Sequence, residues 1–108
     1  MVALKKEALA VLIPGTTHVL ERSGKEAFVY FETDGAAHML LDDGEQRSGH
    51  WTILDDGYVA EWDSGATGRW MLDHDGGSVT YVNRDSAARL KMIGVLFGNA
   101  KGLPLQRT

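Results

Sequence analysis

Residues 49–72 read GHWTILDDGYVAEWDSGATGRWML and hold all three tryptophans of the chain, Trp51, Trp62 and Trp70. Three short apolar runs are separated here by two turns that contain glycine. Asp56-Gly57 stands between the first two runs, and such a pair is a strong hairpin signal because aspartate followed by glycine suits the tight turns that match strand twist. The stretch therefore predicts three consecutive antiparallel strands that carry large rings into one core.

Length and composition predict a single domain over residues 1–108. A chain of 108 residues is long enough for one hydrophobic core. Its 44% hydrophobic and 24% charged residues are ordinary for a globular protein. Thirteen glycines fall mostly singly between apolar runs, which is typical of an all-β chain with many turns.

One short helix is predicted ahead of the strands. Apolar residues recur at helical spacing at Leu4, Ala8, Leu9 and Leu12. Pro14-Gly15 ends this pattern, because proline removes a backbone N–H and glycine supplies permissive dihedral angles. We therefore expect an amphipathic helix over residues 3–12.

From Thr16 onward the apolar period falls to two, as in half-buried strands. The predicted strands are residues 17–21, 26–32, 37–41, 46–53, 58–62, 68–73, 78–83 and 88–96. Asp-Gly pairs that begin at residues 34, 43, 56 and 75 mark successive turns. Seven or eight antiparallel strands with tight turns predict a mainly β meander over residues 16–97, closed into a barrel or folded as a sandwich. Residues 98–108 are expected to form a C-terminal loop or tail.

The last predicted strand has a competing interpretation. Leu90, Ile93 and Leu96 also fit helical spacing, and Ser86 would cap a helix over residues 86–97. The alternation around Lys91 and the following glycine favour a strand.

Charge and cysteine content argue against several classes of function. The net charge is −4 and the eleven lysines and arginines are scattered, whereas nucleic-acid recognition needs a concentrated basic face. The chain has no cysteine, so it has neither disulfides nor thiolate metal sites. Residues 8–13 form the longest apolar run, which is far below the roughly 18 residues of a membrane span. We expect a cytoplasmic protein, or a periplasmic one if the sequence is a trimmed mature domain.

Aromatic residues supply the candidate ligand site. An eight-stranded barrel is wide enough to hold one small ligand. Rings with polar tips would line it, and the candidate ligand-binding residues are Tyr30, His38, Trp51, Trp62 and Trp70. The alternative is that these rings fill the interior as plain core.

No metal site, cofactor or catalytic motif is predicted. The four histidines show no metal-binding spacing, although His38 and His50 fall on adjacent predicted strands. The chain has no nucleophile elbow and no phosphate-binding glycine loop. A small barrel enzyme of the isomerase or lyase type would use His38 or Glu61 as its base.

Short motifs spread over residues 10–103 resemble a known group of proteins. They are Gly15-Thr16-Thr17, Tyr30-Phe31 with Asp34-Gly35, Gly49-His50-Trp51, Tyr58–Trp62 and Gly98-Asn99. The pattern is similar to that of small uncharacterised bacterial proteins, mostly proteobacterial, that share a G-N-T start, a G-x-W strand and a closing G-N. The resemblance implies a lipocalin- or avidin-like β-barrel. Thr16 replaces the asparagine of the first motif, and the paired cysteines often seen in the group are absent.

The sequence thus predicts a noncatalytic small barrel that binds a small, mainly apolar ligand or a protein partner. An enzyme with a histidine or glutamate base is the first alternative. A homodimer formed through exposed strands or the N-terminal helix is the second.

Overall fold

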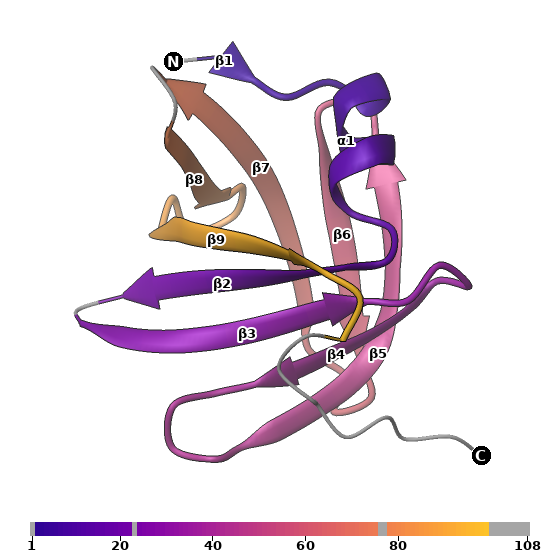
Figure 1. Ribbon diagram of the computed structural model, residues 1–108, viewed down its shortest axis with the longest axis vertical. Coiled ribbons are helices and arrows are strands. Elements are labelled where there is room, and N and C mark those ends of the chain that lie inside the picture. The colour runs from indigo at the N-terminus through magenta and orange to yellow at the C-terminus, as the bar shows by residue number, and fades with distance from the viewer. Residues whose placement is uncertain (1, 23, 76–77, 100–108) are drawn as a thin grey trace.

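The computed structural model describes residues 2–22, 24–75 and 78–99 (Figure 1). Its elements, in chain order, are β1 (Val2–Ala3), α1 (Lys6–Leu12), β2 (Thr16–Arg22), β3 (Lys25–Phe31), β4 (Ala36–Leu40), β5 (Gln46–Leu54), β6 (Gly57–Trp62), β7 (Thr67–Asp75), β8 (Ser78–Asn83) and β9 (Arg89–Phe97). The predicted residues 100–108 of the tail and the glycines of the turn at 76–77 lie outside the described residues.

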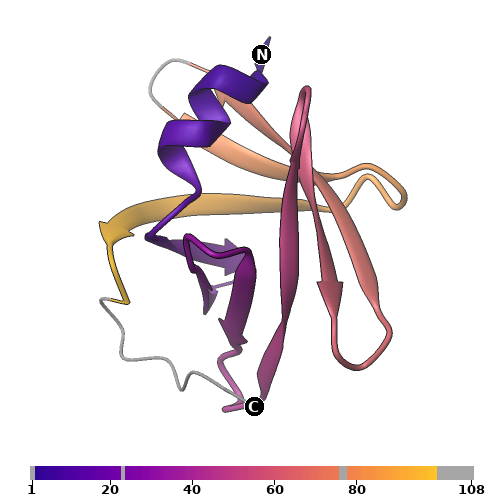
Figure 2. The same cartoon turned by 90° about the vertical axis from the view of Figure 1, so that its right-hand side faces the viewer.

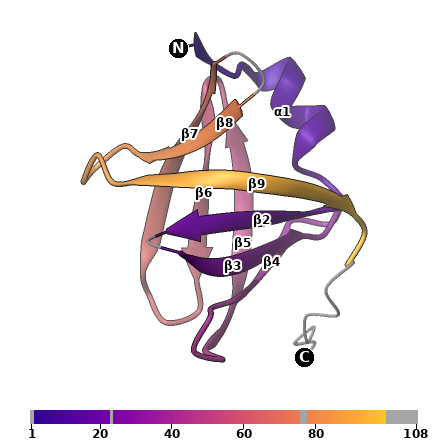
Figure 3. The same ribbon diagram turned by 60° about the vertical axis from the view of Figure 1, so that its left-hand side comes forward.

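Strands β2 to β9 form a closed antiparallel barrel, which confirms the predicted mainly β meander. Each strand pairs with the next one along the chain, and β9 pairs with β2 to close the ring (Figures 1 and 3). The two-residue β1 is an additional strand on β7. Closure leaves the eight barrel strands without a free edge. Free edges are what make open sheets prone to aggregation.

Helix α1 begins later than the sequence predicts, at Lys6 and not at residue 3. The residues before it pair with β7, where Ala3 lies opposite Asp73. The N–H of Leu4 donates to the carbonyl of Leu72 at 2.8 Å, so this segment takes the extended form. The helix lies at one end of the barrel (Figure 2). Its Leu9 is fully buried.

The last strand settles the choice between strand and helix over residues 86–97. β9 pairs with β2 and β8 at once, so both of its edges are used. Ala87 has a φ of 61° in the preceding turn, which a helix capped at Ser86 would not allow. A register shift between Val19 and Leu20 lets β9 bend around the barrel.

The barrel interior is filled by aromatic rings in edge-to-face contact. The centroids of Phe31 and Tyr58 are 5.3 Å apart, and those of Tyr58 and Tyr81 are 5.8 Å apart. The ring centroids of His18 and Phe31 are 4.9 Å apart, and those of Trp70 and Tyr81 are 5.7 Å apart. Such tilted pairs stabilise a core beyond the burial of their area.

Most turns follow the predicted glycine chemistry, but one does not. Gly35 and Gly44 have positive φ angles of 101° and 91°, as a turn glycine should. Neither Asp56 nor Gly57 has a positive φ. Gly57 instead begins β6, where a Cβ would lie 2.1 Å from the carbonyl oxygen of Trp70. The glycine there permits close approach of two strands.

Among the residues that the structure describes, no helix has the length and apolar character needed to span a membrane.

Candidate functional site

Tyr30 and His38 lie together on the outer face of the barrel. Strand neighbours alternate between faces, and Phe31 and Ala37 point into the core, so Tyr30 and His38 point away from it. The two residues are register partners on β3 and β4, and their rings stack with centroids 6.3 Å apart. The side chain of His38 is nevertheless buried, with only 3% of its surface exposed.

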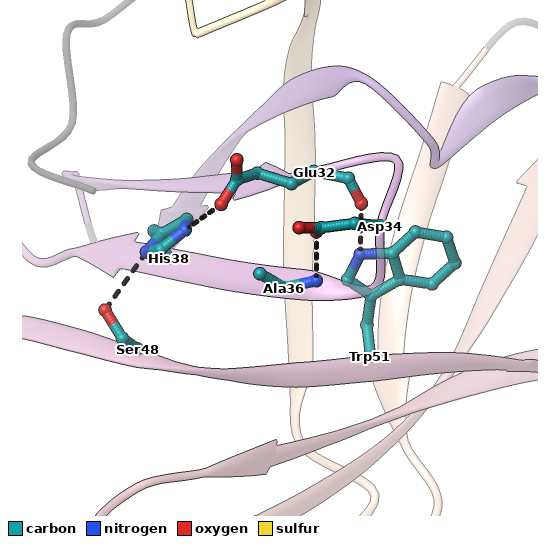
Figure 4. A network of polar contacts seen from close by, with 6 residues as sticks. All are labelled: Glu32, Asp34, Ala36, His38, Ser48 and Trp51. Carbon is teal, nitrogen blue, oxygen red and sulfur yellow. Dashed lines mark hydrogen bonds and ion pairs between the residues drawn. The ribbon is translucent and has the colours of Figure 1, made fainter. Parts of the chain in front are cut away.

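A polar cluster surrounds His38 (Figure 4). Its Nε2 atom lies 2.6 Å from Oε2 of Glu32, which follows β3 directly. Its Nδ1 atom lies 3.0 Å from Oγ of Ser48, the partner of His38 on β5. Glu32 is also buried, with 8% of the residue exposed. These three residues form the Glu32–His38–Ser48 cluster.

The hydrogen bonds of the cluster define where the proton of a neutral His38 lies. An ionised Glu32 only accepts, so Nε2 carries the proton and donates to it. Nδ1 is then free of a proton and accepts the hydroxyl hydrogen of Ser48. A hydroxyl, a base and a group that orients the base therefore stand in line, which is the arrangement of an activated nucleophile.

The hairpin between β3 and β4 holds Glu32 in place. Its N–H donates to the carbonyl of Ala36 at 2.8 Å, and Trp51 donates from Nε1 to the carbonyl of Glu32 at 2.9 Å. Asp34 accepts the N–H of Ala36 at 3.0 Å and so stabilises the turn itself (Figure 4). The carboxylate that faces His38 thus stands on backbone fixed from two sides.

The three tryptophans lie on the inner face, away from Tyr30 and His38. Trp62 belongs to the buried core, and Trp51 and Trp70 pack against it. The ring of Trp51 meets Phe31 edge to face, with centroids 6.1 Å apart. The five predicted ligand-binding residues therefore divide between two faces of the sheet, and Trp51 connects them through its hydrogen bond to Glu32.

A second polar cluster, which the sequence did not reveal, is buried inside the barrel. Nε2 of His18 donates to the carbonyl of Leu12 at 3.1 Å, so its Nδ1 accepts the hydroxyl hydrogen of Tyr81. The hydroxyl groups of Tyr58 and Tyr81 are also hydrogen-bonded to each other. Burial lowers the pKa of His18 from 6.5 to about 4, against the opposing effect of its bond to Leu12. Burial raises the pKa of both tyrosines.

An open apolar groove lies between α1, the start of β8 and the end of β9. Its volume is about 460 Å³. Val11 on the helix and Phe97 on β9 stand on its two sides, with 81% and 90% of their surfaces exposed. Thr16 supplies a hydroxyl to its lining, but that hydroxyl already bonds to the carbonyls of Leu12 and Ile13.

Glu61 and the histidines give little support to the other predicted chemistry. Glu61 is exposed in a broad depression of about 900 Å³ beside Arg69. His50 lies opposite Ala36 and not opposite His38. Within residues 2–22, 24–75 and 78–99 there is no group of three or more His, Asp or Glu side chains placed to hold a metal ion.

The sequence singled out His38, but not its contacts with Glu32 and Ser48. Glu32 is the last residue of the predicted strand 26–32, and Ser48 carries no local motif. The predicted order of three consecutive strands was a usable signal, since it places residues 32, 38 and 48 on neighbouring segments. Neither a protein-family model, nor a curated protein, nor a solved structure was found to match this chain.

Proposed function

We propose that this protein binds a small, mainly apolar ligand in the groove between α1 and β9, a site whose role is binding and not catalysis. The observation that carries the proposal is the exposure of Phe97 and Val11 on the two sides of one apolar groove. Large apolar side chains left in water beside a concave surface commonly mark a binding site. The groove volume of about 460 Å³ falls in the range of small-molecule sites.

The chemistry of the lining favours an apolar small molecule over an extended peptide. Among the described residues, the lining contains no charged side chain, and its one side-chain hydroxyl, on Thr16, is already engaged with backbone carbonyls. The backbone N–H and C=O groups of an extended peptide would lose their bonds to water there without replacement, which is costly. A hydrocarbon chain or ring has no such groups to satisfy.

The test is titration with N-phenyl-1-naphthylamine, an uncharged apolar dye that fluoresces when it leaves water. We expect saturable binding that long-chain alcohols displace. Val11→Asp should weaken dye binding more than tenfold, because it places a charge in the lining. Phe97→Ser should weaken it about tenfold, since burying a phenylalanine side chain contributes about 1.5–3 kcal/mol and 1.4 kcal/mol is tenfold.

Ile93→Ser is the matched control, because Ile93 is also exposed on β9 but does not line the groove. It should bind the dye as the unchanged protein does. Equal affinity for the dye in all variants would contradict the proposal. So would sedimentation as a dimer that Val11→Asp dissociates, because a second copy of the chain would then cover the groove.

A further inference from the structure

We propose that Ser48 is a nucleophile that His38 activates for attack on short-chain acyl esters. This site is separate from the apolar groove and does not depend on what the groove binds. Three observations support it: the hydroxyl of Ser48 lies 3.0 Å from a ring nitrogen of His38, the other ring nitrogen lies 2.6 Å from a carboxylate, and Ser48 lines a surface depression.

Burial makes the pair suited to this role. His38 is almost completely enclosed, while Ser48 is half-buried and reaches the surface. The base is thus shielded from water, and the nucleophile remains accessible to a substrate. Glu32 acts as a positioning residue, since its carboxylate holds the proton of His38 on Nε2 and leaves Nδ1 free to accept.

The depression beside Ser48 limits the size of the substrate. Its volume is about 140 Å³, on the order of five water molecules at about 30 Å³ each. That space suits an acyl group of a few heavy atoms. Gln46 lines the same depression and lies two residues before Ser48 on β5. Because side chains two residues apart on a strand share a face, its amide lies on the same face as Ser48. The side-chain N–H of a glutamine can stabilise the oxyanion that forms on the ester carbonyl.

The chemical step balances without a cofactor. Oγ of Ser48 forms a bond to the ester carbonyl carbon as its proton passes to Nδ1 of His38. The bond from that carbon to the leaving oxygen breaks, and the proton moves from His38 to the departing alcohol. Water then attacks the acyl carbon while His38 takes one of its protons. The bond from that carbon to Oγ breaks, and His38 returns the proton to Oγ, which releases the carboxylic acid and regenerates Ser48.

The test uses a small alkyl fluorophosphonate, which forms a P–O bond to an activated serine and releases fluoride. We expect one adduct, placed on Ser48 by peptide mass mapping, and no adduct at that peptide in Ser48→Ala. Ser64→Ala is the matched control, because Ser64 lines the same depression without a histidine partner. It should be labelled as fast as the unchanged protein.

Two further variants test the roles of His38 and Glu32. His38→Gln should slow labelling about a hundredfold, within the range of a general base. Glu32→Gln should slow labelling about tenfold. It should also change the ¹⁵N chemical shifts of His38, because the proton would no longer be held on Nε2 alone, and loss of packing would not produce that change. Unchanged labelling in folded His38→Gln, or labelling of the unchanged protein no faster than that of Ser48→Ala, would overturn the proposal. The second comparison holds even if His38→Gln does not fold.

Discussion

Replacing Gly49 by alanine is expected to lower the free energy of unfolding by more than about 3 kcal/mol. A Cβ at this position on β5 would lie 2.0 Å from the carbonyl oxygen of Glu61 and 2.8 Å from the Cα of Trp62. Both are backbone atoms of the paired strand β6, so no side-chain rotation relieves the clash. Inserted volume in a packed region typically costs 1–3 kcal/mol, and a clash with backbone exceeds that range.

Thermal unfolding followed by circular dichroism measures the effect of Gly49→Ala. A loss of about 3 kcal/mol corresponds to a fall of roughly 12 °C or more in Tm for a domain of about this size. Gly94→Ala is the control, because its Cβ would lie 3.6 Å from the side chain of Val19, an ordinary contact. Equal Tm values for the two variants would show that β5 and β6 are not as close at Gly49 as described.

Acid is expected to destabilise the protein through His18, by about 3 kcal/mol between pH 6.5 and pH 4. The unfolded chain binds a proton at His18 near pH 6.5, whereas the folded protein does so only near pH 4. Between these values the unfolded state binds more protons, so the free energy of unfolding falls as the pH falls. The magnitude follows from 1.36 kcal/mol for each unit between the two pKa values.

Urea unfolding at several pH values, compared with that of His18→Gln, isolates the contribution of this residue. The amide of glutamine donates and accepts but does not titrate, so the fall in stability over this range should be about 3 kcal/mol smaller in the variant. His50→Gln is the control, because it removes an exposed imidazole from β5 and leaves the core intact. A fall in stability of the same size in His18→Gln as in the unchanged protein would contradict the assignment.

The same buried cluster explains why a histidine stands in the core. His18, Tyr81 and Tyr58 satisfy one another, and the chain of bonds ends at the carbonyl of Leu12. Among the described residues, each buried side-chain nitrogen or oxygen has a hydrogen-bond partner. Buried polar groups are costly only when unpaired, so this network joins β2, β6 and β8 without weakening the core.

Local patterns in the sequence were sufficient for the architecture. The period of two from Thr16 onward, the glycine turns and the stop at Pro14-Gly15 depend on neighbours in the chain, and they predicted a mainly β meander with one short helix. The alternation around Lys91 correctly favoured a strand at the C-terminal end. The start of α1 was misplaced because Leu4 is held by Leu72, a residue far along the chain.

The sites depend on register and closure, which local patterns do not determine. A shift of one residue in pairing moves every side chain of a strand to the other face. The register of β3, β4 and β5 sets Tyr30 opposite His38 and His38 opposite Ser48. The hairpin between β3 and β4 then places the carboxylate of Glu32 against the imidazole of His38. The apolar groove requires α1 to lie beside β9, although these two elements are separated by most of the chain. The sequence by itself determined that an antiparallel β meander with one short N-terminal helix would form, because strand period and turn chemistry are local. Only the tertiary structure decided which polar groups meet and which apolar side chains remain exposed, because those outcomes depend on contacts between segments distant in sequence.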